Sequence, residues 1–351
     1  MSKLLPTMAD VAREAGVSVV TVDRVLNKRG SVRPSTRQKV IESARRLQFA
    51  LAKIQDARAE APPAVDPAGT KSVAFLLLRS DDDFYRALAR SMARQAGEHA
   101  QIKAHRVYYL DGLSPEQCAE LLLQCGVDHD AIALTCVDHP RVNQAVDQLS
   151  QAGVRICTFI TDITASQRAG YVGIDNRKAG RTAAWAVSRL SRRPGKVGIL
   201  LGDHRFLCQE LCEISFRSYF REQAPGFALL DTRLTFESAS QAAMVTRQLL
   251  DEHPDLVGLY VSCGGEDGVI EALKARGRQA DVVVVTHDLT GTTRDALVAG
   301  VVDVTLSLPV EASIRALIDL MINASPNSPV PHVRGFENVL IPFDINTIEN
   351  I

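Results

Sequence analysis

From Lys71 onward the sequence alternates between short apolar runs and amphipathic stretches, which limits the chain to a narrow set of folds. The apolar runs predict strands at Val73–Leu78, Val107–Leu110, Ala131–Thr135, Ile156–Ile160, Val197–Leu201, Leu256–Val261, Val282–Thr286 and Val301–Leu306. Helical spacing is found between them, at Phe84–His99, Pro115–Cys125, Arg141–Ala152, Arg177–Leu190, Ala239–His253, Gly268–Arg276 and Val310–Ile322. Strands that alternate with helices form parallel sheets covered on both faces. About 280 residues are too many for one such sheet, so we expect two similar lobes.

The stretch from Thr7 to Asn27 predicts two short helices joined by a tight turn. Apolar residues recur at helical spacing on both sides of this turn: Val11, Ala12 and Ala15 before it, and Val19, Val22, Val25 and Leu26 after it. Gly16 suits a turn closed to residues with a Cβ atom, and Ser18 can cap the second helix. A third helix is expected from about Pro34 to Leu47, with proline in its first turn. This is the pattern of a helix-turn-helix, whose second helix enters a major groove of DNA.

The formal net charge of −1 conceals an asymmetry along the chain. Residues 1–60 contain 12 Lys and Arg against 6 Asp and Glu, whereas the remainder contains 28 against 35. A basic segment on an acidic body is what phosphate binding at one end of the molecule predicts. Charge alone is a weak argument, but together with the helix pattern it favours a nucleic-acid partner.

Length and composition are ordinary for a globular protein, with 351 residues, 46 % of them hydrophobic and 23 % charged. This length allows two or three domains. No apolar run reaches the roughly 18–20 residues that cross a bilayer, and the first residues lack the apolar core of a signal peptide, so we expect a cytoplasmic location. The seven cysteines are scattered along the chain and predict free thiols.

Several segments resemble the LacI/GalR family of bacterial transcription regulators. Within the helix-turn-helix region, here called the headpiece, these are DVAREAGVS, TVDRVLN and VRPSTRQKV, in the order and spacing of that family. In the body they are VGIDNRKAGRTAA (172–184), HPDLVGLYVSCGG (253–265), VVVVTHDLTG (282–291) and LVAGVVDVTLSLP (297–309). The resemblance implies an all-α helix-turn-helix headpiece and an α/β two-lobed periplasmic-binding-protein-like (type I) domain. That domain would have parallel sheets and a ligand cleft between its lobes.

The resemblance also divides the chain into domains. The headpiece spans 1–49, a hinge or linker 50–70, the two-lobed ligand-binding and dimerisation domain 71–343, and a tail 344–351. The chain should cross between the lobes near 161–167, 289–292 and 322–326. In the family, a leucine of a short hinge helix wedges into the minor groove of the operator. That position falls on Arg58 here, with Leu51 and Ile54 as the nearest apolar candidates, which weakens the case for a kinked operator.

The resemblance assigns DNA contacts to the start of the second helix. Val19, Val20 and Arg24 occupy positions that face base edges, where arginine can bind guanine O6 and N7 and valine can contact a thymine methyl group. Short polar residues suited to phosphate oxygens are Ser18, Thr21, Asn27 and Thr36. The alternative for Val19 is packing in the headpiece core. Asp23 stands where the family usually has serine, and it either orients Arg24 or accepts a hydrogen bond from cytosine N4.

Ligands of such sheets bind at the carboxyl ends of the strands. The resemblance places a polar residue and then aromatic rings in the first of these loops, with one ring against the apolar face of a sugar. Carboxylates after later strands can accept hydrogen bonds from neighbouring hydroxyl groups. The expected ligand residues are Asp82, Phe84, Tyr85, Asp162, Arg205, Ser262, Gly264, Asp288 and Ser307. Asp288 is the leading candidate, with a helix cap or a link between lobes as its alternative, and a helix cap is the favoured role of Asp175.

Together these features imply a ligand-responsive, sequence-specific DNA-binding regulator, a repressor of carbohydrate-uptake or catabolic genes. Its partners would be palindromic operator DNA, a small sugar or sugar derivative as effector, and a second copy in a homodimer or tetramer. Nucleophile-elbow, Walker, zinc-protease and dinucleotide motifs are missing, so we expect neither an enzyme nor a cofactor. His204, Cys208 and Cys212 share a four-residue spacing without a fourth ligand, so we expect no metal. Control by a partner protein and a non-regulatory sugar-binding protein are the alternatives.

Overall fold

The computed structural model describes residues 7–26, 33–46, 70–323 and 337–351. Within these ranges the headpiece contains α1 (Met8–Ala15), α2 (Val19–Leu26) and α3 (Pro34–Arg46). Thr7 begins α1 with a capping box, because its side chain accepts from the Asp10 amide while the Asp10 carboxylate accepts from the Thr7 amide. Gly16 ends α1 with φ 66° and ψ 37°, a left-handed conformation that residues with a Cβ atom avoid. The helix-turn-helix predicted from the sequence is confirmed.

Small apolar side chains hold the three headpiece helices together. Val11 and Ala12 of α1, Val22 and Val25 of α2, and Val40 of α3 are buried against one another. Such a small unit buries a smaller fraction of its surface than a large domain does, so each of these side chains matters for its stability.

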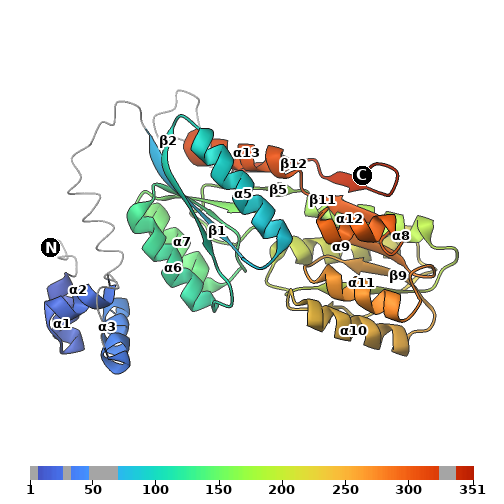
Figure 1. Cartoon of the computed structure of the whole chain (residues 1–351), viewed down its shortest axis with the longest axis horizontal. Coiled ribbons are helices and arrows are strands. Elements are labelled where there is room, and N and C mark those ends of the chain that lie inside the picture. Colours follow the sequence, from blue (N-terminus) through green and yellow to red (C-terminus); the bar gives the residue numbers. More distant parts are fainter. Residues whose placement is uncertain (1–6, 27–32, 47–69, 324–336) are drawn as a thin grey trace.

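The first lobe is a six-stranded parallel sheet covered by helices on both faces (Figure 1). Its strands are β1 (Lys71–Leu77), β2 (Ile102–Tyr109), β3 (Ala131–Leu134), β4 (Arg155–Phe159), β5 (Gly170–Ile174) and β12 (Glu337–Ile341), in the spatial order β12-β5-β4-β3-β1-β2. Helices α5 (Asp83–Glu98) and α13 (Val310–Asn323) pack together on one face, and α6 (Pro115–Asp128) and α7 (Pro140–Gln151) on the other. Side chains of β1 are buried on both faces, as expected for an inner parallel strand.

The second lobe is built in the same way around a seven-stranded sheet. Its strands are β6 (Lys196–Leu201), β7 (Ala228–Leu229), β8 (Arg233–Leu234), β9 (Leu256–Val261), β10 (Val283–His287), β11 (Val304–Ser307) and β13 (Asp344–Asn346). The order is β13-β11-β10-β9-β6-β7, with β8 also paired to β6 and β13 antiparallel to β11. Helices α8 (Asn176–Leu190) and α9 (Leu207–Gln223) cover one face, and α10 (Ala239–Glu252), α11 (Glu266–Ala275) and α12 (Gly291–Val298) the other.

Helices α8 and α9 approach each other closely because Gly180 has no side chain at their contact. A Cβ atom at this position would lie 2.2 Å from the backbone oxygen of Cys212 and 2.4 Å from Ser215 Oγ. Phe216 of α9 also stacks on Tyr260 of β9, with ring centroids 4.7 Å apart and 10° between the ring planes. These contacts fix α9 on its sheet, and α9 carries several residues of the site described below.

The described chain passes between the lobes three times, at positions other than those expected. β5 belongs to the first sheet and α8 to the second lobe, so the first crossing lies at Asp175 and not at 161–167. β11 pairs with β10 while α13 packs on the first lobe, so the second lies at 308–309 and not at 289–292. β12 and β13 belong to different sheets, which puts the third at 342–343 and not at 322–326. Asp175 also caps α8 through the Lys178 amide at 3.1 Å, as predicted.

Several strands lack the continuous apolar run that predicts a buried strand, which is why the expected crossings were wrong. β5 contains two glycines, β7 and β8 have two residues each, and β12 and β13 are largely exposed edge strands. Residues 344–351 are therefore not a separate tail, because β13 pairs with β11 and brings Asp344 opposite Ser307. Helix α12 was also missed in the sequence pattern.

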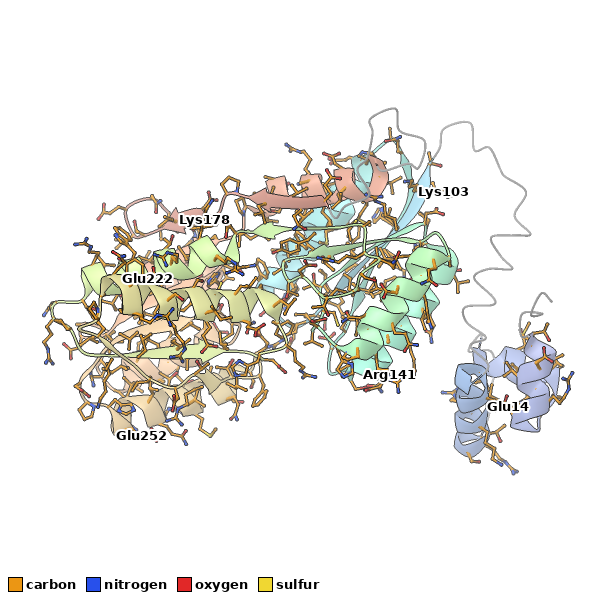
Figure 2. All side chains as sticks on the ribbon, turned by 180° about the vertical axis from the view of Figure 1, so that it is seen from behind. Glu14, Lys103, Arg141, Lys178, Glu222 and Glu252 are labelled. Carbon is orange, nitrogen blue, oxygen red and sulfur yellow. The ribbon has the colours of Figure 1, made fainter. Side chains whose placement is uncertain are left out.

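Apolar side chains face the sheets, whereas charged side chains cover the outer helical surfaces. Arg141, Lys178, Glu222 and Glu252 are examples of exposed charged residues on four different helices (Figure 2). Among the described helices, none is both long enough and apolar enough to span a membrane. The seven cysteines are free thiols, as predicted.

Candidate functional site

An exposed surface at the start of α2 follows directly from the turn. Ser18 caps the helix, since its Oγ accepts from the Thr21 amide at 3.2 Å. Val19 and Val20 are 46 % and 59 % exposed, so Val19 does not pack in the headpiece core, and Arg24 is exposed one turn further along. Helical spacing places these three side chains within one side of α2, which we call the α2 surface.

The structure describes the remaining predicted DNA contacts only in part. Ser18 and Thr21 lie side by side, with 2.9 Å between their hydroxyl oxygens, and Thr36 is partly exposed on α3. The residues outside the described ranges are Asn27 and the hinge candidates Leu51, Ile54 and Arg58. Asp23 is partly buried on α2, and both of its suggested roles stay predictions.

A cavity of about 110 Å³ lies between the two sheets. Residues at or after strand ends line it from both lobes: Leu78, Thr135 and Ile160 after β1, β3 and β4, and Ser262, Asp288 and Leu308 after β9, β10 and β11. In a parallel sheet the carboxyl ends of all strands share one edge, so both lobes present this edge to the same space. The sequence rule that placed ligand residues in these loops is consistent with this arrangement.

Asp82, Phe84 and Tyr85 enter the cavity from the start of α5. Asp82 caps the helix, with its Oδ1 accepting from the Phe84 amide at 2.9 Å and the Tyr85 amide at 3.2 Å. The two rings meet edge to face, with centroids 5.4 Å apart. The cap therefore holds a carboxylate and two aromatic rings together at the first-lobe wall.

Hydrogen bonds join the two lobes beside the cavity. They run from the Asp138 amide to the Arg205 carbonyl oxygen (2.8 Å), from the Cys208 amide to Thr161 Oγ1 (3.4 Å), and from the Arg79 guanidinium to the Glu237 carbonyl oxygen. The lobes thus touch each other at the same place where a ligand would touch both. A bound molecule and these contacts would therefore favour the same arrangement of the lobes.

Six of the nine predicted ligand residues line the cavity: Asp82, Phe84, Tyr85, Ser262, Gly264 and Asp288. Asp162 does not line it, because its carboxylate is engaged within the first lobe. Arg168 donates to it twice, from Nε to Oδ1 at 2.6 Å and from Nη2 to Oδ2 at 2.5 Å, and the Thr158 hydroxyl donates to Oδ1 at 2.6 Å. The ligand role expected for Asp162 is thus replaced by a structural one.

Arg205 and Ser307 also lie outside the cavity lining. Arg205 is half-exposed and ion-paired with Asp203, with 2.6 Å between Nη2 and Oδ2. Ser307 is buried under the last strand, where its hydroxyl donates to Asn346 Oδ1 at 2.7 Å. The sequence could not show either arrangement, since β13 was not predicted and the Asp203 partner depends on the bend of the loop after β6.

Glu237 is a lining residue that the sequence reasoning missed. Its Oε1 accepts from Gln209 Nε2 and its Oε2 from the Gly264 amide, both at 2.7 Å. Its backbone has φ 57°, a strained conformation for a residue with a side chain. Gly202 and Gly264 leave the room for this carboxyl group, because Cβ atoms there would lie 1.7 Å and 2.6 Å from its oxygens. Recognising β8 as a strand would have been the signal, since Glu237 follows its carboxyl end.

Glu266 and His287 line the cavity as well and were not predicted. Glu266 begins α11 after Gly265, whose φ of 92° makes a sharp turn out of β9. His287 ends β10, and its Nε2 lies 2.7 Å from the Tyr260 hydroxyl. Burial lowers the pKa of His287 to about 4, so the ring is uncharged at neutral pH. Glu266 lies two residues after Gly264, and His287 directly precedes Asp288; both neighbours were among the predicted ligand residues.

Burial shapes the acid–base state of the cavity. It raises the pKa of Asp288 to about 7, against the lowering effect of the Leu308 amide, which donates to Asp288 Oδ1 at 3.1 Å. Burial also raises the pKa of Glu237 and, to a greater extent, that of Glu266. The described residues contain no group of three or more His, Cys, Asp or Glu side chains placed to hold a metal ion.

An all-α helix-turn-helix joined to two parallel α/β lobes with a cavity between them defines a class of DNA-binding regulators built on a periplasmic-binding-protein fold. Residues 7–50 match the family described as bacterial regulatory proteins, lacI family, and residues 73–325 match the periplasmic binding protein domain. Over most of its length the chain therefore belongs to the periplasmic binding protein domain family, and its N-terminal headpiece is a DNA-binding segment of the lacI family.

Known proteins are similar to this chain over different parts of its length. Catabolite control protein A of Priestia megaterium is 56 % identical over 43 residues, which is 12 % of this chain and 13 % of that protein. The HTH-type transcriptional regulator GalS of Salmonella typhimurium is 24 % identical over 274 residues, 77 % of this chain and 76 % of that protein. An ABC transporter solute binding protein of Burkholderia graminis, solved with D-arabinose, has a TM-score of 0.70 and 19 % identity, covering 81 % of this chain and 97 % of that one. That likeness shows the fold.

Proposed function

We propose that this chain is a ligand-responsive regulator that represses genes of carbohydrate uptake or catabolism in the cytoplasm. A small sugar or sugar derivative, bound between the lobes, would act as the effector that changes its affinity for operator DNA. The observation that carries the proposal is one chain with both an exposed helix-turn-helix surface and a cavity lined from two lobes. It acts by binding, and no catalytic step is proposed.

The α2 surface supports sequence-specific DNA binding. Exposed valines offer apolar contact to thymine methyl groups, and Arg24 offers a two-pronged contact to guanine. Ser18, Thr21 and Thr36, at or just before the first turns of α2 and α3, are the residues that would contact phosphate oxygens. Because one small headpiece has few contacts, tight binding calls for two copies on a palindromic site, so we propose a homodimer as the functional unit.

The cavity supports control of this binding by a small molecule. A ligand there would contact loops of both lobes, so its binding free energy would depend on how close the lobes are. β1 begins at Lys71, directly after the predicted linker, so the first lobe is the one that carries the headpiece. A change in the lobe arrangement of each copy would then alter the spacing of two headpieces, and operator affinity would change with it.

The DNA part is tested with Arg24→Ala in the full chain. The preferred duplex is first selected from random oligonucleotides with the wild-type protein, and affinities are then measured by fluorescence anisotropy. Loss of a two-pronged arginine–guanine contact removes about 1–3 kcal/mol, so we expect affinity for the selected duplex to fall about 5- to 150-fold. Affinity for a scrambled duplex at low salt should change much less.

Arg13→Ala is the matched control, because Arg13 is another exposed headpiece arginine, paired with Asp10 on α1. It should retain the preference for the selected duplex. If Arg24→Ala kept full discrimination, the assignment of α2 as the reading helix would be wrong. For the effector part, sugars that bind should change the affinity for the selected duplex in one direction or the other; a protein that responds to no small molecule but to a partner protein would refute that part.

A further inference from the structure

The cavity between the lobes is lined by four carboxyl groups: Asp82 from the first lobe, and Glu237, Glu266 and Asp288 from the second. Its described lining contains no lysine or arginine. Its one histidine, His287, has a pKa that burial lowers to about 4, and so adds no positive charge at neutral pH. The cavity and the two lobes around it define the site. The carboxyl groups in its lining determine which charge of a ligand is favoured there.

Two of these carboxyl groups, one from each lobe, have one oxygen held by backbone amides and the other left for a ligand. In Asp82, Oδ1 accepts from the Phe84 and Tyr85 amides, and in Asp288, Oδ1 accepts from the Leu308 amide. Within the described part of the chain, no further hydrogen bond reaches Oδ2 of either residue. Because the two aspartates come from opposite lobes, a group that binds both oxygens would also hold the lobes together.

The cation Arg79 lies beside this cluster but is engaged elsewhere. Arg79 lies at the end of β1, beside the cavity and outside its lining. Its Nε and Nη2 donate to Asp81 at 3.0 Å and 3.1 Å, and its Nη1 donates to the Glu237 carbonyl oxygen. Arg79 lowers the pKa of Glu237, but burial outweighs it, and the pKa of Glu237 is raised. The carboxyl cluster therefore has no full countercharge from the described residues around the cavity.

The other lining groups suit a polyhydroxylated molecule. Thr161, Ser262 and Asn176 bring hydroxyl and amide groups into the same space. The Phe84 and Tyr85 rings offer a flat apolar wall, which can pack on the CH face of a sugar and attract a cation. A phosphate or carboxylate group on a ligand would meet carboxyl groups and no lysine or arginine in the described lining, so it would lack a countercharge.

We infer that the effector is an amino sugar or a related polyol with a protonated amine, whose ammonium group lies between Asp82 and Asp288. The inference rests on the proposed function and narrows its effector class. An ammonium group has three N–H donors and one positive charge, which matches carboxylate oxygens on two sides. The hydroxyl groups of the same molecule would meet the polar side chains and its apolar face the aromatic rings.

The test uses the full chain, thermal-shift assays and calorimetry with matched probes. Each set consists of a 2-amino-2-deoxyhexose, its parent hexose and its N-acetyl form, in the gluco, galacto and manno series, with glucose 6-phosphate and gluconate as anionic members. At least one amine should bind 10-fold or more tightly than both its parent and its N-acetyl form. Anionic members should bind more weakly than the neutral parent.

Proton release gives a second readout that shape alone would not produce. An ammonium ion beside Asp288 lowers the pKa of that group from its raised value, so binding near pH 6.5–7 should release protons, seen as a dependence of the heat on the buffer. The titratable and charged groups around Asp288 are Asp82, Glu237, Glu266, His287 and Tyr85 in the lining and Arg79 beside it, and of these Glu237 and Glu266, whose pKa burial also raises, can add to the release. A neutral sugar should release few protons.

Variants then test whether individual carboxyl groups cause the preference for the amine over its parent sugar. Glu266→Gln and Asp288→Asn should each reduce the ratio of amine to parent affinity at least 5-fold, whereas Asp295→Asn, exposed on α12, should leave the ratio unchanged. If a neutral parent binds as tightly as its amine, the inference is overturned while the proposed function stands. If an anionic member binds best, the inference is also overturned. If no member binds at all, both this inference and the sugar-effector part of the proposal are overturned.

Discussion

Replacing Asp288 by asparagine should stabilise the protein at high pH and much less at low pH. Asp288 is partly buried at the cavity between the lobes, and this burial raises its pKa from 3.8 to about 7. Asparagine has nearly the same shape, tolerates the left-handed backbone found here (φ 59°), and keeps an oxygen for the Leu308 amide. The substitution therefore removes the charge while changing little else.

The magnitude follows from the two pKa values. Since the folded pKa lies above the unfolded one, the folded state holds the proton more tightly. The contribution of Asp288 to wild-type stability is thus most favourable below pH 4, declines as the pH rises from about 4 to about 7, and is least favourable above 7. The whole difference between 3.8 and about 7 corresponds to about 4 kcal/mol at pH 8 and to less than about 2 kcal/mol at pH 5. Loss of a charged acceptor for the Leu308 amide offsets about 1 kcal/mol.

Thermal unfolding of wild type and Asp288→Asn at pH 5 and pH 8 measures this difference. We expect a gain of about 3 kcal/mol at pH 8, or roughly 5–10 °C in Tm for lobes of this size, and a gain near zero at pH 5. Asp295→Asn on the exposed face of α12 is the control, and it should change stability by less than about 0.5 kcal/mol at either pH. Equal gains at both pH values, or a loss at pH 8, would refute the role of charge burial.

Two glycine substitutions test the backbone and packing arguments. Gly16→Ala should destabilise the headpiece by about 1–2 kcal/mol, seen in its thermal melt, because φ is 66° where α1 ends. Gly180→Ala should destabilise the second lobe by more than about 2 kcal/mol, although alanine favours helix, since its Cβ would lie 2.2 Å from the Cys212 backbone oxygen. A neutral or stabilising effect in either melt would contradict the corresponding contact.

Much of the fold could be predicted from sequence because it depends on near neighbours. The capping roles of Ser18 and Asp175 depend on residues three positions away, and Gly16 depends on its own backbone angles. Buried strands such as Leu256–Val261 have continuous apolar runs because both of their faces are covered. Edge strands such as Asp344–Asn346 have no such run. They were therefore not predicted, and the crossings between the lobes were predicted at the wrong positions.

The candidate site shows the limit of the same reasoning. Asp162 and Asp288 both follow apolar strands, and both were ligand candidates, with Asp288 the leading one. Arg168 folds back onto Asp162 and engages both of its oxygens, whereas among the described residues the Leu308 amide is the one donor to the Asp288 carboxylate. Glu237 had no motif, and its place in the cavity depends on room left by glycines far away in sequence.

The amino-acid sequence by itself determined the headpiece, the alternation of helices and strands, the helix caps and the edge of the sheets at which a ligand would bind. These follow from periodicity and from hydrogen bonds within a few residues. Only the tertiary structure decided which carboxyl groups gather in the cavity and which are neutralised by arginine. That outcome depends on charges and burial contributed by both lobes, from residues as far apart as Asp82 and Asp288, and no local pattern records such distances.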